Sequence, residues 1–412
     1  MASLTRTKTL LYSAGSVGAG AFYAFNNFVL PQLLKSAGAS DLVTGLLSST
    51  RSIEGAIIQP TIGALSDRTR TRLGRRRPFI VIGVPLSAAL FLFAATQHEV
   101  LGLTLAIVLF SIFFNAAADP YVALLADITT PDERGALQGV STGVQLISQV
   151  AFLALIAAVV TTATVPEWSY WLVAAVMVLT FGLTVIGVRE PLIADEPAPE
   201  RPRLGLRGYV AELAGQRQAL RYLAAIFVFM LGFSAVLPFL TLFITVDIGE
   251  NERIALGLAA ATLLVTAASA VASGRLADRI GDKPVLAGGW TLLAVAAFGG
   301  LVIQHLPETI VVVLIAGVGN GAATAAGWPL LASLIPAERT GVFAGLKTAA
   351  ESIAVPASVA IAAELLIPRF SYRGIFVLLA STILVALFIL VRYVRPPGRE
   401  STAIPIDDPA VI

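Results

Sequence analysis

The sequence predicts an all-α membrane protein with twelve transmembrane helices in two pseudo-symmetric six-helix bundles. Three observations predict it. The 412-residue chain is 57% hydrophobic and 13% charged, whereas a soluble domain is about 25% charged. Its apolar residues form long runs, and about 20 such residues are enough for one helix to cross a bilayer. Several short patterns also recur in the same order half a chain apart, as expected for a duplicated bundle.

The predicted spans follow the apolar runs, because only helices satisfy their own backbone hydrogen bonds in lipid. In the first half they are 10–34, 42–65, 78–97, 100–126, 136–163 and 167–188. In the second half they are 221–246, 254–274, 284–304, 308–334, 340–366 and 372–394. The first run is long enough to remain as a span rather than to act as a cleaved signal.

Charge and composition predict the domains and the topology. Residues 189–220 are rich in proline and in both charges, and therefore predict a cytoplasmic linker between an N-terminal bundle (1–188) and a C-terminal bundle (221–394). A cytoplasmic tail (395–412) follows. Most of the 28 Lys and Arg residues lie in loops on one side of the predicted spans. This bias predicts that both termini are cytoplasmic, and the Ala-, Gly- and Arg-rich composition favours a bacterial inner membrane.

Three patterns recur at offsets of 205 to 211 residues, about half the chain. They are Val29-Leu30-Pro31 with Val236-Leu237-Pro238, Gly63-x-Leu65-x-Asp67-Arg68 with Gly274-x-Leu276-x-Asp278-Arg279, and Leu124-Leu125-Ala126 plus Pro131-x-Glu133-Arg134 with Leu330-Leu331-Ala332 plus Pro336-x-Glu338-Arg339. Their common order and offset indicate two copies of one bundle. Transporters with such repeats bind their solute between the two halves.

The most strongly charged stretch joins the second and third predicted spans. It contains six arginines: Arg68, Arg70, Arg72, Arg75, Arg76 and Arg77. So many arginines beside membrane helices place this loop in the cytoplasm. Two interpretations remain open, namely that the cluster only fixes the topology or that it also gates a pathway.

Polar side chains inside the predicted spans mark the candidate binding site, because ionisable groups are costly in the membrane and are usually functional there. The candidates are Tyr23, Asn26, Asn27, Arg51, Glu54, Asn115, Asp119, Gln145, Gln149, Asn320, Trp328, Lys347 and Glu351. Amides and carboxylates suit a polyol, whose hydroxyls both donate and accept hydrogen bonds. Tyr23 or Trp328 could stack on a sugar ring. Alternatively, Arg51–Glu54 and Lys347–Glu351 are structural ion pairs and Trp328 packs against its neighbours.

Over essentially its full length the chain resembles a major facilitator superfamily transporter. The residues 274–283 match the loop motif of that superfamily, and the longer first loop, 66–79, resembles that of the glycoside–pentoside–hexuronide cation symporters and sucrose transporters. Gln59-Pro60-x-x-Gly63 and Ala123-Leu124-Leu125-Ala126-Asp127 are similar to the sucrose-transporter branch. That branch has an arginine where this chain has Val122, which weakens sucrose as the solute.

The resemblance implies gating residues in the charged loops. Matched to the motif, they are Asp67, Arg68, Arg75, Arg76, Asp278 and Arg279, together with Asp127, which we expect to act with Arg134. These carboxylates and arginines would lock the two halves when the cavity faces outward.

The resemblance also bears on coupling. Its sodium-using members carry two acids on the second span, where this chain has Glu54 and, at one of those places, Gln59. A proton is therefore expected rather than sodium, and the candidate coupling carboxylates, in order, are Asp119, Glu54 and Glu351. We expect no cofactor and no metal, and the absence of cysteine excludes thiolate sites.

The leading hypothesis is a secondary active transporter that carries a sugar or glycoside in symport with a proton by alternating access. Two alternatives remain open: a carrier of lipids or amphipathic drugs, and a membrane protein that binds pigment or assists assembly without transport. No nucleophile elbow, phosphate loop or metal-ligand cluster suggests an enzyme. The expected partners are a small solute and membrane lipid, without nucleic acid, and the expected state is a monomer.

Overall fold

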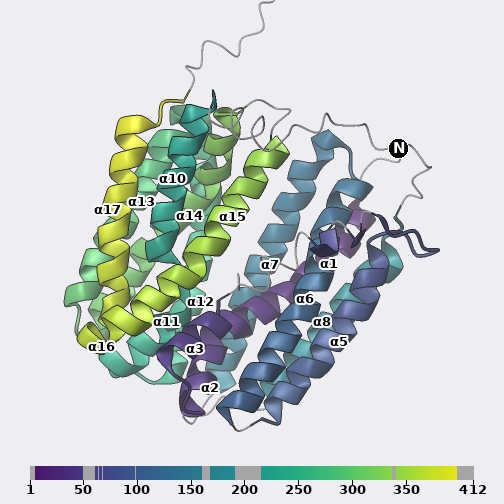
Figure 1. The fold of residues 1–412 in the computed structure, drawn as a ribbon, viewed down its shortest axis with the longest axis horizontal. Helices are drawn as coiled ribbons and strands as arrows, with labels where there is room; N and C mark the ends of the chain where they lie inside the picture. The colour runs from purple at the N-terminus through teal and green to yellow at the C-terminus, as the bar shows by residue number, and fades with distance from the viewer. Residues whose placement is uncertain are drawn as a thin grey trace, which may run out of the picture.

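The computed structural model describes residues 5–49, 61–63, 65–66, 68–97, 99–159, 168–190, 215–335 and 340–396. Throughout these ranges the regular structure is helical. Figure 1 shows two groups of helices side by side, the first in purple and blue and the second in green and yellow. The first helix group comprises the described residues up to 190, and the second helix group comprises those from 215 onward.

The first helix group begins with a helix interrupted by a π-helical turn and continues with four long helices. Its elements are α1 (Arg6–Ala24), η1 (Phe25–Val29), α2 (Leu30–Ser36), α3 (Asp41–Leu47), α5 (Arg77–Ala95), α6 (Val100–Ile128), α7 (Pro131–Val159) and α8 (Trp168–Gly187).

The second helix group also begins with a helix that is followed by a break and by further long helices. Its elements are α10 (Arg217–Phe233), α11 (Val236–Leu242), η2 (Phe243–Asp247), α12 (Glu252–Ile280), α13 (Asp282–Val302), α14 (Leu306–Ser333), α15 (Thr340–Ile361), η4 (Ala362–Leu366), α16 (Ile367–Phe370), η5 (Ser371–Arg373) and α17 (Gly374–Tyr393).

Nine stretches of the described residues are long and apolar enough to cross a membrane. One of them, Gly345–Tyr393, contains two helical arms, because the chain turns at η5 between α16 and α17. The predicted all-α membrane fold is therefore confirmed. The count of twelve spans and the domain boundaries stay predictions.

Local sequence explains several helix boundaries. Thr5 precedes α1, and its hydroxyl accepts a hydrogen bond from the backbone N–H of Lys8. Ser40 caps α3 and Asn251 caps α12 in the same way. Such side chains satisfy N–H groups that the first helical turn leaves unpaired. α12 ends at Gly281, whose φ of +98° is favourable for glycine but not for other residues.

The two groups repeat one packing scheme. In the first, α1 packs on α7 and α8, and α5 packs on α6 and α8. In the second, α10 packs on α15 and α17, and α13 packs on α14 and α17. Each contact therefore has a counterpart in the other group. This correspondence agrees with the duplicated patterns in the sequence.

Both copies of the Val-Leu-Pro pattern restart a helix after a break. In the first group, α2 begins at Leu30 after the π-helical turn η1. In the second, α11 begins at Val236 after a turn at Ser234 and Ala235. Proline favours such breaks because it has no N–H for the helical ladder. The breaks bring Asn27 and Ser234, which are 207 residues apart, to corresponding places near the centre of the molecule.

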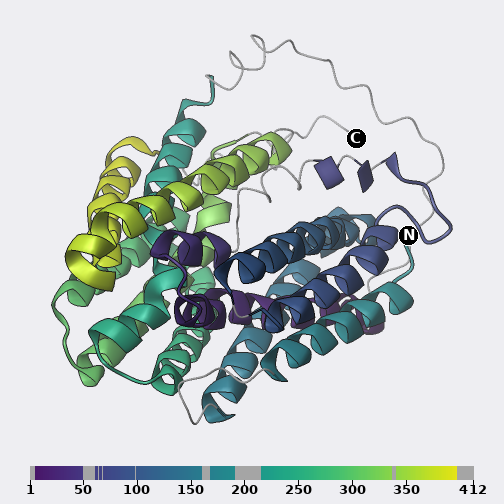
Figure 2. The same cartoon turned by 60° about the horizontal axis from the view of Figure 1, so that its bottom comes forward.

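The two groups contact each other mainly at one end. We call the end that carries the arginine loop (68–77) the basic end, and the end that carries α2, α3, α11 and η5 the opposite end. At the opposite end, α2 packs on α11 and α3 packs on α15. Figure 2 shows α3, in purple, beside the second group. α7 and α12 also pack across the boundary.

Specific contacts close the opposite end. Gln32 donates a hydrogen bond to the Thr245 hydroxyl at 3.2 Å across the two groups. Tyr372 donates one to Asp41 at 2.8 Å. A Cβ added at Gly45 would lie 2.6 Å from the Phe239 ring, so this ring packs directly on the Gly45 backbone.

The faces near the basic end are uncovered. Gly135 and Gly139 on α7, and Gly345 on α15, are exposed. A Cβ added at any of these glycines would meet no atom within 4 Å. The molecule is therefore closed at the opposite end and separated at the basic end.

Candidate solute-binding site

Two adjoining pockets lie near the centre of the molecule. The central pocket encloses about 620 Å³ between the two groups. The side pocket encloses about 680 Å³ within the second group, between α10, α13, α14 and α15. Met230, Phe233 and Glu351 line both pockets. Because three residues are shared, we treat the two pockets as one site.

The charged group of this site is the Lys347–Glu351 ion pair. The two residues are one turn apart on α15, where side chains four positions apart face each other, and Lys347 Nζ donates to Glu351 Oε1. Glu351 is only 3% exposed. A buried charge in the membrane needs a partner, and Lys347 supplies it. The pair places one carboxylate at the junction of the two pockets.

The wall from the first group is neutral and polar. Asn27, Ser48 and Ser49 line the central pocket, and Ser234 and Pro238 face them from the second group. Neighbouring Asn26 donates from its amide to the Ser48 carbonyl at 3.1 Å. This bond connects η1 to the end of α3. The wall thus presents amide and hydroxyl groups of the kind that bind sugar hydroxyls.

The side pocket combines aromatic and polar groups. Trp328 and Asn320 come from α14, and Trp290 comes from α13. Tyr222 also lines it, and its hydroxyl donates to the Gly327 carbonyl at 2.8 Å. Trp290 stacks on Phe229 with ring centroids 4.8 Å apart. Trp328 is 40% exposed, so one ring remains open to a solute.

The structure brings together five of the predicted site residues and separates the others. Those that line the two pockets are Asn27, Asn320, Trp328, Lys347 and Glu351. Those that line neither are Tyr23, Asn26, Asn115, Asp119, Gln145 and Gln149. Arg51 and Glu54 fall outside the described residues.

Several of the separated residues have identifiable neighbours in the first group. Tyr23 packs edge-on against Phe114, with ring centroids 5.9 Å apart. Asn115 donates to the Ser111 carbonyl at 2.9 Å. Gln149 is buried on α7, and Asp119 is half-buried on α6. Of the candidate coupling carboxylates that the structure describes, only Glu351 lines the site.

Sequence reasoning missed three serines of the central pocket. Ser234 lies 207 residues after Asn27, the same offset that separates the two Val-Leu-Pro patterns. Applying this offset to each polar residue would have found it. Ser48 and Ser49 gave no such signal, because small hydroxyl residues are common in membrane helices.

The arginine loop is fixed within the first group. Arg75 and Arg76 both pair with Asp127 at the end of α6, and Arg76 Nε lies 3.1 Å from Asp127 Oδ2. The backbone N–H of Arg76 donates to the Glu190 carboxylate at 3.0 Å. Glu190 was not predicted, although an acid directly after a predicted span and near an arginine loop is a usable signal.

The joint gating role expected for Asp127 and Arg134 stays a prediction. In the structure Arg134 donates to the Ala126 carbonyl at 3.2 Å. A cation is favourable there, because carbonyls at a helix C-terminus carry partial negative charge. The gating roles stay predictions. Arg68, Asp278 and Arg279 are exposed near the basic end, and Asp67 lies outside the described part of the chain.

A glycine shapes each copy of the charged loop. Gly74 has φ of +103° and Gly281 has φ of +98°, and the two are 207 residues apart. A Cβ at Gly74 would overlap the Glu190 carboxylate, whereas one at Gly281 would come no closer than 3.8 Å to Pro284. The same turn thus occurs in both halves, but only the first is packed against an acid.

Two matching helix groups with a polar site between them define a membrane transporter rather than an enzyme. The chain belongs to the family described as MFS/sugar transport protein, whose model matches residues 11–374. Proteins of this family are transporters of the major facilitator superfamily. The resemblance found in the charged loops therefore extends across nearly the whole chain.

Sequence relatives point to the same branch. A sucrose transport protein of Arabidopsis thaliana, SUC3, is 30% identical over 140 residues, which cover 29% of this chain and 24% of that protein. The putative glycoside/cation symporter YagG of Escherichia coli is 30% identical over 146 residues, which cover 34% of this chain and 32% of that protein. In both comparisons the matched segment is about a third or less of the relative.

Solved structures show the same fold. A D-xylose-proton symporter has a TM-score of 0.68 at 17% identity, covering 93% of this chain and 96% of that chain. The nucleoside transporter NupG has a TM-score of 0.73 at 12% identity, covering 94% and 99%. At these identities the likeness extends to the fold alone.

Proposed function

We propose that this protein is a secondary active transporter that carries a sugar or glycoside in symport with a proton by alternating access. The observation that carries the proposal is the buried Glu351 carboxylate, which lines the site between the helix groups and pairs with Lys347. Family membership supports a sugar as the solute. The relatives named above, a sucrose transport protein and a putative glycoside symporter, support the same class.

The proposed orientation follows from the arginine loop. Arginines beside membrane spans favour the cytoplasmic side, so the basic end and both termini are assigned to the cytoplasm, in a bacterial inner membrane. The molecule would then be closed toward the outside and open toward the cytoplasm. The return step would open the contacts at the opposite end and bring the uncovered glycine faces of α7 and α15 together. The arginine loop would take part in that closure.

Glu351 becomes the first candidate for coupling, ahead of Asp119 and Glu54. A proton on Glu351 would neutralise the carboxylate and release Lys347 to contact a solute hydroxyl. Loss of the proton would restore the ion pair and displace that hydroxyl. Proton and solute would thus bind together and leave together, which is what symport requires. Asp119 lies on α6 away from both pockets, and Glu54 lies outside the described residues.

Proteoliposomes with an internal pH dye test the proposal. A panel of mono- and disaccharides is added outside, and one sugar is expected to acidify the interior. Glu351→Gln is expected to abolish acidification while solute exchange continues, because only the titrating group is lost. Glu364→Gln, an exposed glutamate further along the same arm, serves as the matched control.

The other outcomes assign the function elsewhere. Acidification that survives Glu351→Gln but not Asp119→Asn would move coupling to α6. A sugar that crosses without any change in pH would replace symport by uniport. If no sugar changes the internal pH, and a lipid or hydrophobic amine raises the melting temperature of the protein instead, the sugar proposal is overturned.

A further inference from the structure

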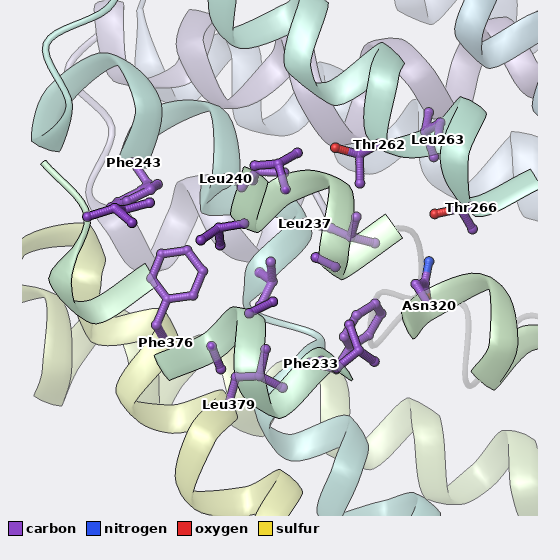
Figure 3. Close-up of a pocket in the computed structure, with 18 of the residues that line it drawn as sticks. Phe233, Leu237, Leu240, Phe243, Thr262, Leu263, Thr266, Asn320, Phe376 and Leu379 are labelled. Carbon is purple, nitrogen blue, oxygen red and sulfur yellow. The ribbon is translucent and has the colours of Figure 1, made fainter. Parts of the chain in front are cut away.

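An apolar chamber lies mainly within the second helix group, and the proposed sugar site does not use it. Phe28 of the first group also lines the chamber. The chamber measures about 760 Å³, including space that is open to solvent, between α11, α12, α13, α14 and α17. Figure 3 shows the chamber, whose wall is formed chiefly by aliphatic and aromatic side chains. They include Phe233, Leu237, Leu240, Phe243, Phe376 and Leu379. A polyol would find few hydrogen-bond partners in such a space.

The chamber adjoins the candidate site. Phe233 lines the chamber, the central pocket and the side pocket. Leu237 lines the chamber and the central pocket, and Asn320 lines the chamber and the side pocket. The two compartments therefore meet along one wall, with polar groups on one side and apolar groups on the other.

Three polar side chains line the chamber, namely Thr262, Thr266 and Asn320. The Thr262 hydroxyl donates to the Leu258 carbonyl at 2.7 Å. Thr266 is only 5% exposed, and among the described residues its hydroxyl has no hydrogen-bond partner. In Figure 3 Asn320 and Thr266 lie close together on one side of the chamber. A buried hydroxyl without a partner is unfavourable, so this pair indicates a place where a bound molecule supplies a polar atom.

The chamber contrasts with the core of the first group. There, Phe22, Phe91, Phe110 and Phe114 fill the interior, and the rings of Phe22 and Phe114 lie 4.4 Å apart. Protein interiors normally have few voids larger than a water molecule. Empty apolar cavities stay dry and bind apolar molecules. An unfilled space beside a binding site therefore points to an apolar part of the ligand.

We infer that the solute is an amphipathic glycoside, with its sugar in the central and side pockets and an apolar aglycone in the chamber. The Thr266 hydroxyl and the Asn320 amide bind the oxygen that joins the two parts. This inference rests on the proposed sugar transport and names its substrate class. A sugar alone would leave the chamber empty, and a simple lipid would leave the Lys347–Glu351 pair without a polyol.

Calorimetric titration of the full chain in lipid nanodiscs tests the inference. The probes are methyl, propyl and butyl glucosides and the matching galactosides. The dissociation constant is expected to fall about fourfold for each methylene that enters the chamber. Ala297→Leu, which fills the chamber from α13, should abolish this gain and leave methyl glycoside binding within about twofold of the wild type.

Two further variants separate binding from folding. Ala294→Leu lies one turn away on α13 and does not line the chamber, so the gain with chain length should persist. Thr266→Val keeps the shape of the side chain and removes the hydroxyl. It should weaken all the glycosides by a similar factor, because they share the linking oxygen.

Three results would overturn the inference. Equal affinity for methyl and butyl glycosides in the wild type would mean that the sugar binds alone, and sugar transport would stand. If affinity still rises with alkyl chain length in Ala297→Leu, the alkyl chain lies in lipid or elsewhere on the protein. Binding of a lysophospholipid but of no glycoside would overturn the proposed function as well, in favour of a lipid carrier.

Discussion

At the residue scale, Gly74 shows how one position can combine two constraints. Its positive φ strains any residue that has a Cβ, at a cost of about 1–2 kcal/mol. Its contact with the Glu190 carboxylate leaves no room for a methyl group. Gly281 shares the first constraint but not the second.

Alanine substitution at these two glycines separates the constraints. Gly281→Ala should lower the free energy of unfolding only by the cost of the strained backbone. Gly74→Ala should lower the free energy of unfolding by the same amount plus about 1–3 kcal/mol, because it displaces a buried carboxylate from its hydrogen bond. The measurement is the free energy of unfolding of both variants in one detergent. Equal losses would show that the Glu190 contact contributes nothing.

Single residues also show what the sequence could and could not reveal about the site. Glu351 and Lys347 were predicted, because charges within a span are conspicuous. Their junction position was not, because it depends on how α15 packs against α10 and α14. The ion pairs of Asp127 were not predicted, because they depend on the folded loop, which brings Arg75 and Arg76 to that carboxylate.

At the scale of elements, α10 and α17 illustrate packing through a glycine. A Cβ added at Gly232 would lie 2.8 Å from the Leu379 Cα, which is a backbone atom and cannot turn aside. Small residues at membrane-helix interfaces allow this kind of approach. The helices must therefore separate if the residue becomes larger.

Gly232→Ala should lower the melting temperature by several degrees, because a shift of about 1–3 kcal/mol from overpacking affects the whole second group. Gly257→Ala, on α12, provides the control. An added Cβ there meets nothing within 4 Å, and alanine favours a helix more than glycine does. Thermal unfolding curves that coincide for the two variants would contradict this account.

Hydrophobic runs predicted where the helices lie, but not where they are interrupted. The first predicted span, 10–34, corresponds to α1, η1 and α2 together. The π-helical turn within it was not predicted, because a change in hydrogen-bond register leaves no mark in hydrophobic periodicity. Pro31 and Pro238 gave the only local signal, and the observed breaks precede both.

At the scale of the whole molecule, contacts between the two groups close the opposite end. Tyr372→Phe removes the hydrogen bond between the two groups to Asp41. Loss of about 1 kcal/mol should shift the population several-fold toward the state closed at the basic end. Tyr170→Phe, a buried tyrosine of the first group, is the control.

Maleimide labelling reports this shift directly. The sequence contains no cysteine, so a single cysteine introduced by Gly139→Cys or Gly345→Cys is the only reactive thiol. Both positions are exposed and should label quickly. Adding Tyr372→Phe should slow the labelling several-fold, whereas a rate equal to that of the Tyr170→Phe control would rule out the Asp41 contact as a latch.

The fold class could be predicted from composition, hydrophobic runs and the internal repeat, because each reflects the membrane or the duplication itself. The open side and the apolar chamber could not. Both depend on contacts between residues hundreds of positions apart, and near-identical helix patterns are compatible with either open side. The duplication predicts that the helices of the two halves have the same arrangement, but it does not predict that their cores are packed alike.

The chamber also makes the two halves mechanically unequal. Hydrostatic pressure favours states of smaller volume, and the effect on a protein scales with the internal void that disappears. In the described part of the first group, aromatic rings pack closely in the core. The second group contains the apolar chamber, whose unfilled space can collapse inward. Pressure would therefore compress mainly the second half of the duplicated molecule. A ligand that occupies the chamber would make the two halves equally resistant to compression.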